Sequence, residues 1–364
     1  MKIIKYNTMK QIYFLTCLLL FINIKGNSQT SDVLTGLSSP YALTLNENEL
    51  FISDIQKGSI SKIDITLALP IPLDIITNEG SIYDMEIKGN FLYFSNLRDG
   101  KISKTDITLT TPVVTDVLTG LNKPLGLAFK GNELFIAEWG ARRILKILDI
   151  TANTPVVVEV LINLNRPTKF AFKDNELYFT LDADGKVSKI NDVTESSLTV
   201  TEVVKGLTNP VDIVFNGNDL YISEPKTNTI TDKIHKTDIS KITPTLTEVT
   251  TGISGPRGII FKENVLYIAE TYAAKISKLD ISSLSLNQFN KNNIDIKIYP
   301  NPSTKLLQVS GLIKKEQYKI YNILGEKVME GIITENENIN IRNLKNGVYL
   351  FRINKGNTLK FLKE

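Results

Sequence analysis

Residues 131–151 read GNELFIAEWGARRILKILDIT. Two runs of alternating apolar and polar residues stand on either side of the loop EWGARR at 138–143. Alternation with a period of two is typical of half-buried β-strands, so this stretch predicts a β-hairpin. A hairpin alone is only marginally stable in water, and we therefore expect other strands to pack against it.

The hairpin pattern recurs along the chain. Its second strand closes each time on an aspartate, at intervals of 42 to 46 residues, and these aspartates are Asp64, Asp106, Asp149, Asp192, Asp238 and Asp280. A loop and another strand precede each hairpin, as in TGLNKPLGLAF at 119–129, and one more apolar strand follows, as in TPVVTDVLTGL at 111–121. Four short strands in a repeat of this length predict the blades of an all-β, six-bladed β-propeller.

The sequence also predicts how the ring closes. Residues 31–37, SDVLTGL, match 115–121, TDVLTGL, which supply a fourth strand to an earlier repeat. The sixth repeat has no such strand after Asp280. We therefore expect residues 31–35 to complete the sixth blade and to remove the open sheet edge.

The N-terminus is predicted to be a signal peptide spanning residues 1–28. Lysines precede an apolar run at 12–24, and Gly26 and Ser28 supply small residues before a cut at Gln29. The apolar run is shorter than the roughly 20 residues that span a bilayer, so we expect no transmembrane segment in the mature chain.

Composition narrows the classes of function. The chain has 364 residues and a formal net charge of +3, with lysines and carboxylates interspersed along it. No phosphate loop, dinucleotide fingerprint or basic aromatic stripe is present, so we expect no nucleic-acid partner. The only cysteine, Cys17, lies in the signal peptide, which leaves the mature chain without a disulfide or a thiol nucleophile.

The repeat motifs P-x-G-[IL]-x-F, N-x-L-[YF]-[IV]-[AS]-[DE] and [RK]-I resemble those of NHL and six-bladed SMP-30 and YWTD-type propellers. The resemblance covers residues 31–283 and assigns residues 29–283 to the propeller domain. Those families include sugar-lactone hydrolases, streptogramin lyases and binding scaffolds, so the resemblance implies a fold and leaves the function open.

A second domain follows a polar linker at residues 284–294. Residues 295–364 alternate as strands between Pro-Asn-Pro, Leu-Gly-Glu and Asn-Gly turns, which predicts a small Ig-like β-sandwich. The motifs YPNPS, YNILGEKV and LKNGVYLFRI resemble the type A C-terminal sorting domain of the type IX secretion system. That resemblance implies that residues 295–364 bind the type IX secretion machinery, which delivers the protein to the cell surface or the medium.

A calcium site is one possibility at the channel. Asp84 and Asp212 do not recur in the repeat, and with Asn96 they offer the oxygen ligands that Ca²⁺ prefers. Alternatively, the two aspartates pair with Lys169. Four carboxylates that recur with the repeat are expected instead to accept backbone hydrogen bonds in turns; these are Asp54, Glu138, Glu224 and Glu270. Alignment of the repeats places Asp182 at the same loop position.

The resemblance to SMP-30-type propellers implies an alternative function, a Ca²⁺-dependent gluconolactonase-like hydrolase or lyase. Streptogramin lyases need a catalytic histidine, and the only histidine here is His235. We expect His235 to be an exposed strand or loop residue and not a base. A zinc site is disfavoured, because zinc sites use several His or Cys ligands.

Aromatic and cationic residues on the propeller loops suggest a ligand site. Trp139, the only tryptophan, stands beside Arg142, and the loops entering the first strands carry Tyr41, Tyr83 and Arg257. Such groups can stack on a sugar or hold an acidic partner. The alternative is that Trp139 only caps a blade edge. We expect a binding role, without catalysis, toward an extracellular protein or glycan.

Overall fold

The computed structural model describes residues 30–225, 232–282, 297–312, 315–353 and 358–364. The chain divides into two compact units, Met1–Ser283 and Leu284–Glu364. The predicted signal peptide at 1–28 and the predicted linker at 284–294 lie outside the described residues.

The first unit consists of six four-stranded antiparallel sheets. Blade one contains β2 (Pro40–Asn46), β3 (Glu49–Asp54), β4 (Ser59–Asp64) and β5 (Leu73–Ile76). Blade two contains β6 (Ile82–Lys88), β7 (Phe91–Asn96), β8 (Lys101–Asp106) and β9 (Thr115–Leu118). Blade three contains β10 (Pro124–Lys130), β11 (Glu133–Glu138), β12 (Arg143–Ile147) and β13 (Val157–Leu161).

The other three sheets repeat this plan. Blade four contains β14 (Pro167–Lys173), β15 (Glu176–Leu181), β16 (Lys186–Ile190) and β17 (Val200–Lys205). Blade five contains β18 (Ile213–Asn216), β19 (Asp219–Glu224), β20 (Lys233–Asp238) and β21 (Thr247–Thr250). Blade six contains β22 (Pro256–Lys262), β23 (Val265–Glu270), β24 (Lys275–Asp280) and β1 (Ser31–Thr35).

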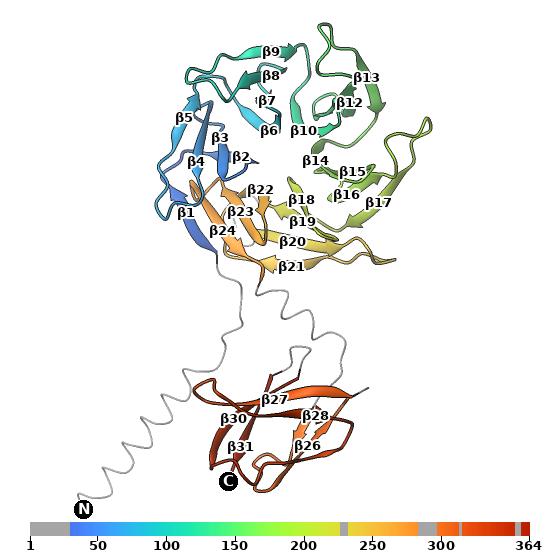
Figure 1. Ribbon diagram of the computed structural model, residues 1–364. Coiled ribbons are helices and arrows are strands. Elements are labelled where there is room, and N and C mark those ends of the chain that lie inside the picture. Colours follow the sequence, from blue (N-terminus) through green and yellow to red (C-terminus); the bar gives the residue numbers. More distant parts are fainter. Residues whose placement is uncertain (1–29, 226–231, 283–296, 313–314, 354–357) are drawn as a thin grey trace, which may run out of the picture. The chain divides into compact units, whose positions relative to one another are not determined.

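The six sheets form a closed ring, as Figure 1 shows, and each innermost strand contacts the innermost strands of both neighbouring blades. β1 completes blade six by pairing with β24, with Ser31 opposite Lys278 and Thr35 opposite Lys275. The Nζ atom of Lys275 also lies 2.7 Å from Asp32 Oδ1. The prediction of six blades closed by residues 31–35 is confirmed.

The hairpin at 131–151 is buried by the blades on both sides of it. On β11, Leu134 and Ile136 pack in a cluster with Tyr93 of blade two. Phe135, between them in the sequence, packs in a cluster with Phe179 of blade four. Because successive side chains of a strand point to opposite faces, a blade covered on both faces needs an unbroken apolar run. This requirement explains why consecutive apolar residues fill the middle of the second strand in every repeat.

Lysines at the ends of the innermost strands link four of the six blades to the next blade. The Nζ atom of Lys88 donates to Gly131 O at 2.5 Å, and that of Lys262 donates to Glu47 O at 2.8 Å. Lys130 bonds Asp174 O in the same way, and Lys173 bonds Gly217 O at 2.7 Å. These four residues are called the rim lysines below. Each holds the first hairpin turn of the following blade.

The second unit is a β-sandwich. One sheet contains β25 (Lys297–Tyr299), β26 (Leu306–Ser310) and β29 (Asn338–Asn340). The other contains β28 (Lys327–Ile333), β27 (Glu316–Asn322), β30 (Gly347–Ile353) and β31 (Thr358–Lys363). Leu307 and Ile320, from different sheets, belong to one buried apolar cluster. The prediction of a small β-sandwich is therefore confirmed.

Candidate ligand-binding sites

The propeller has two faces that the strand register defines. Pro40, at the start of β2, lies opposite Asp54 at the end of β3, so both belong to one face, called the upper face below. Asn46 and Glu49 flank the first hairpin turn and define the lower face. Every blade repeats this arrangement. The loops that carry Trp139 and Arg257 therefore belong to the upper face, as the sequence predicts.

The carboxylates that end the second strands accept backbone hydrogen bonds. Asp54 accepts the N–H of Ser38 at 2.7 Å, and Glu270 accepts that of Ser254 at 2.9 Å. Glu224 accepts the N–H of Thr208 at 2.6 Å. Glu138 accepts that of Asn122 at 2.5 Å. These four residues fasten the loop that enters their own blade, as expected for turn acceptors.

Asp182 does not belong to this series. In blade four the residue opposite the first-strand proline, Pro167, is Leu181, so Asp182 lies one position further along the loop. Its Oδ2 atom accepts the indole N–H of Trp139 from the preceding blade at 3.1 Å. The sequence expectation for Asp182 was wrong because the segment TLDADG places its carboxylate one residue late.

Trp139 lies in a cationic hollow between blades three and four. The hollow has a volume of about 460 Å³, and its walls include Arg142, Asn165 and Arg166. The guanidinium carbon of Arg166 lies 4.8 Å from the ring centroid of Trp139, and the Nζ atom of Lys123 lies 5.2 Å from it. Among the residues that the structure describes, Lys123, Arg142 and Arg166 form no ion pair with a carboxylate.

Arg257, Tyr41 and Tyr83 form a second aromatic and cationic group on the upper face. The guanidinium carbon of Arg257 lies 5.5 Å from the ring centroid of Tyr41, and the Tyr41 and Tyr83 centroids are 4.5 Å apart. A guanidinium nitrogen of Arg257 donates to the Tyr272 hydroxyl at 3.3 Å. Trp139 and Arg142 are not part of this group. The structure thus divides the predicted ligand residues into two clusters on one face.

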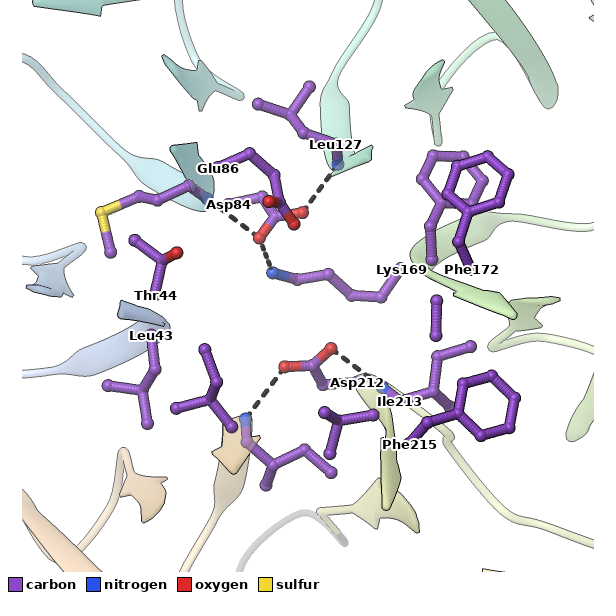
Figure 2. Close-up of a pocket in the computed structure, with 16 residues that line it drawn as sticks. Leu43, Thr44, Asp84, Glu86, Leu127, Lys169, Phe172, Asp212, Ile213 and Phe215 are labelled. Atoms are coloured by element: carbon purple, nitrogen blue, oxygen red, sulfur yellow. Dashed lines mark hydrogen bonds and ion pairs between the residues drawn. The ribbon is translucent and has the colours of Figure 1, made fainter. Parts of the chain in front are cut away.

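Asp84 and Asp212 lie inside the channel, one position beyond the upper-face residues of their strands. Lys169, on β14, forms an ion pair with Asp84 across the channel, and all three residues are buried. Figure 2 shows these side chains converging in the channel from β6, from β14 and from the position directly before β18. Burial alone would lower the pKa of Lys169, but the neighbouring Asp84 and Asp212 raise it. The ammonium group therefore stays charged in the channel.

Of the three residues proposed for Ca²⁺, Asp84 and Asp212 line the same cavity and Asn96 does not. Asn96 is buried at the end of β7, where its amide contacts Glu79 O and lies 2.8 Å from Asp99 Oδ2. Asp84 is bound to Lys169 and to backbone N–H groups, and Asp212 accepts the backbone N–H groups of Ile213 and Ile259. Within the described part of the chain, no group of three or more His, Cys, Asp and Glu residues could hold a metal ion. The donor set does not fit calcium.

Glu86 is a channel residue that the sequence analysis missed. It lies two positions after Asp84 on β6 and lines the same cavity of about 330 Å³. Burial, together with the charge of Asp84, raises the pKa of Glu86 to about 8. Burial likewise raises the pKa of Asp212 to about 6. Glu86 therefore holds its proton at neutral pH, whereas Asp212 is ionised.

The cavity opens toward the lower face. Its wall includes Phe172 and Phe215, near the lower ends of β14 and β18, and none of Tyr41, Tyr83 or Arg257. Tyr41 is 7% exposed, and the residues at the same level in blades three to five are buried as well. These are Leu125, Thr168 and Val211. The upper end of the channel is thus closed by side chains.

His235 is not near the channel. It lies on β20, the third strand of blade five, and its Nε2 atom is 2.7 Å from Glu224 Oε2. Its side chain is 14% exposed, so it is a partly buried strand residue and not an exposed one. This contact is among the causes that lower the pKa of Glu224 to about 2, against the opposing effect of burial.

Comparison with known proteins assigns the second unit. Residues 297–364 match the family described as Secretion system C-terminal sorting domain. This domain marks the chain for type IX secretion to the cell surface or outside the cell. No curated protein matches the chain. No described helix is both long and apolar enough to cross a membrane.

Solved structures similar to this chain share the propeller fold. A catalytically inactive virginiamycin B lyase from Staphylococcus aureus, crystallised with quinupristin, is 18% identical with a TM-score of 0.51, and the match covers 69% of this chain and 98% of that one. A luciferin-regenerating enzyme is 10% identical with a TM-score of 0.56, covering 69% and 94%. Identities this low show the fold alone.

Proposed function

We propose that this protein is an exported binding module that holds an acidic glycan through its upper face, at the Trp139 hollow. The observation that carries the proposal is the position of Trp139 among Lys123, Arg142 and Arg166, three exposed cations without carboxylate partners in the described chain. A partly exposed indole offers an apolar face to a sugar ring, and the cations offer charge to its carboxylate or sulfate groups.

Hydrogen bonds hold two side chains of the hollow in position. The indole N–H of Trp139 is bound to Asp182, and Arg142 Nε donates to Leu164 O at 3.0 Å. Burial raises the pKa of Asp182, and the Trp139 hydrogen bond and the charge of Arg166 oppose that rise. A positioned ring and a positioned guanidinium lose less conformational entropy on binding than mobile ones.

The Arg257 group supplies a second anion-binding position on the same face. Arg257 has no carboxylate partner among the described residues, and Tyr272 beside it is 46% exposed. A polymer that carries repeated acidic groups can occupy both positions at once, which raises its avidity over that of a single sugar. This arrangement favours a polymeric glycan over an isolated monosaccharide.

The test is affinity electrophoresis and calorimetry of the mature chain with polygalacturonate, neutral dextran and polyglutamate. We expect binding to polygalacturonate alone, with Trp139→Ala weakening it about tenfold or more, which is about 1.4 kcal/mol. Arg342→Ala, an exposed arginine of the sorting domain, is the matched control and should bind normally. Equal binding of polyglutamate with no effect of Trp139→Ala would instead show an acidic protein partner, and no binding would remove the proposal.

A further inference from the structure

The lower channel cavity is a second enclosed space, separate from the Trp139 hollow. Its volume of about 330 Å³ falls within the range of small-ligand sites. Polar groups supply most of the surface that the cavity exposes, and the apolar residues of its lining, among them Ala171, Val214 and Ile260, supply the rest. The polar residues of the wall are Thr44, Asp84, Glu86, Lys169 and Asp212.

The charges of this wall are unbalanced. Asp84 and Lys169 form an ion pair and neutralise each other. Asp212 accepts the backbone N–H groups of Ile213 at 2.8 Å and Ile259 at 2.9 Å. These two hydrogen bonds and the more distant charge of Lys169 stabilise its carboxylate. Glu86 forms no hydrogen bond or ion pair with any other described residue. The cavity therefore carries an excess of negative charge and one free carboxyl group.

We propose that the lower channel cavity binds a small organic cation, a primary amine whose ammonium group binds Glu86 beside Asp212 and whose hydrocarbon part contacts the apolar residues of the lining, such as Val214 and Ile260. A cation of this kind balances the excess negative charge of the cavity. The site does not depend on the glycan proposal, because it opens on the opposite face.

Binding is coupled to a proton. In the empty cavity Glu86 is protonated at neutral pH, because burial and the charges of Asp84 and Asp212 disfavour its carboxylate, while Lys169 acts in the opposite direction. An ammonium ion at this position favours the carboxylate. The neutral carboxyl group then loses its proton to solvent as the ammonium–carboxylate pair forms, so amine binding releases one proton.

The rim lysines do not compete for Glu86. The ammonium groups of Lys88, Lys130, Lys173 and Lys262 bind carbonyl groups of the following blades, at the lower hairpin turns. Lys88, Lys130 and Lys173 also lie over aromatic rings of those blades. Their hydrogen bonds direct the ammonium groups toward the neighbouring turns, and Glu86 is left for the ligand.

The test is calorimetry of the mature chain with phenethylamine, 2-phenylethanol and 3-phenylpropionate, which match in size and differ in charge. We expect the amine to bind at least about tenfold more tightly than the other two. We also expect proton release near pH 7, measured as the dependence of the binding heat on the ionisation enthalpy of the buffer. Glu86→Gln should abolish the proton release and weaken amine binding about tenfold or more.

Two further variants make the result decisive. Ala171→Phe fills the cavity and should abolish binding, with folding checked by circular dichroism. Trp139→Ala changes only the upper face and should leave amine binding unchanged, which separates this proposal from the glycan proposal. Equal affinity for the amine and the alcohol, proton release that persists in Glu86→Gln, or no binding at about 10 mM amine would overturn the proposal.

Discussion

Asp84, on β6 of blade two, and Asp212, directly before β18 of blade five, occupy equivalent positions in two blades that face each other in a ring of six. Each carboxylate accepts the backbone N–H of the following residue and another N–H from the next blade. Asp84 reaches Leu127 of blade three at 2.7 Å, and Asp212 reaches Ile259 of blade six at 2.9 Å. The two junctions are built alike, although their blades are far apart in the sequence.

The next blade carries a glycine at the matching position of each junction. A Cβ atom on Gly126 would lie 2.2 Å from Thr168 O, and one on Gly258 would lie 2.4 Å from Tyr41 O. Only glycine permits this close approach of neighbouring inner strands. The channel therefore has an approximate twofold repetition, which Lys169 interrupts because it stands in blade four alone.

Asp212 should contribute more to stability than a surface carboxylate. Asp212→Ala leaves the N–H groups of Ile213 and Ile259 without acceptors, and we expect the free energy of unfolding to fall by about 2–4 kcal/mol. Asp212→Asn keeps an acceptor oxygen and should cost clearly less. Urea unfolding followed by circular dichroism at pH 7 measures both, with Glu195→Ala in an exposed loop as the control. Equal costs in the two Asp212 variants would contradict this role.

Glu86 should make stability depend on pH between about pH 4.5 and pH 8. Its pKa rises from an ordinary value of 4.5 to about 8 on folding, so the folded protein holds a proton that the unfolded chain releases. Stability is therefore highest at low pH and is lost as the pH rises through 8. Asp212 has the same sign, but its pKa of about 6 confines its effect to lower pH.

The measurement is urea unfolding of Glu86→Gln and the parent protein at pH 6 and pH 9. We expect the parent to lose about 1 kcal/mol more than the variant between these pH values, a figure reduced because Glu86 is partly exposed to solvent. Glu195→Gln should behave like the parent. An identical pH dependence in Glu86→Gln would mean that Glu86 titrates normally.

Removal of β1 should open the ring. A chain lacking residues 31–35 leaves the edge of β24 unpaired and exposes part of the cluster that contains Leu43, Ile52 and Ile276. We expect a lower melting temperature and concentration-dependent association on size-exclusion chromatography, because a free strand edge pairs with other chains. The control, Asp32→Asn, removes only a surface ion pair and should change little. Normal melting of the truncated chain would show that β1 does not fasten the propeller.

Deletion of residues 295–364 should stop export and leave folding intact. The two units are separately compact, so the propeller should melt at the same temperature with or without the sorting domain. Cell fractionation should then find the truncated protein in the periplasm and the full chain at the surface or in the medium. Surface display of the truncated protein would mean that another segment carries the export signal.

Local sequence predicted the blades well because each depends on a pattern that repeats. The recurrence of the hairpin that contains β11 and β12, and the match of residues 31–37 to 115–121, were enough to predict the sheets and their closure. The channel was harder to predict. Glu86 is one polar residue in the strand IYDMEIK, and only the closed ring brings it near Asp212 and Lys169.

The rim lysines could have been predicted from the sequence, but only by aligning the six repeats of this chain with one another. A lysine ends the innermost strand in four of the six blades, and these are the rim lysines. The division of Trp139 and Arg257 into two clusters had no local signal, because it depends on which blades are neighbours. Asp182 was misplaced by one residue because Leu181 takes the usual position of the carboxylate.

The pairing of β1 with β24 means that the chain is interrupted inside a blade and not between two blades. The inner strands of consecutive blades contact each other at all six junctions. A circularly permuted chain, with Thr30 joined by a short linker to Ser282 and new termini placed in the exposed loop after Asp106, keeps β1 beside β24 and should therefore keep all six interblade contacts.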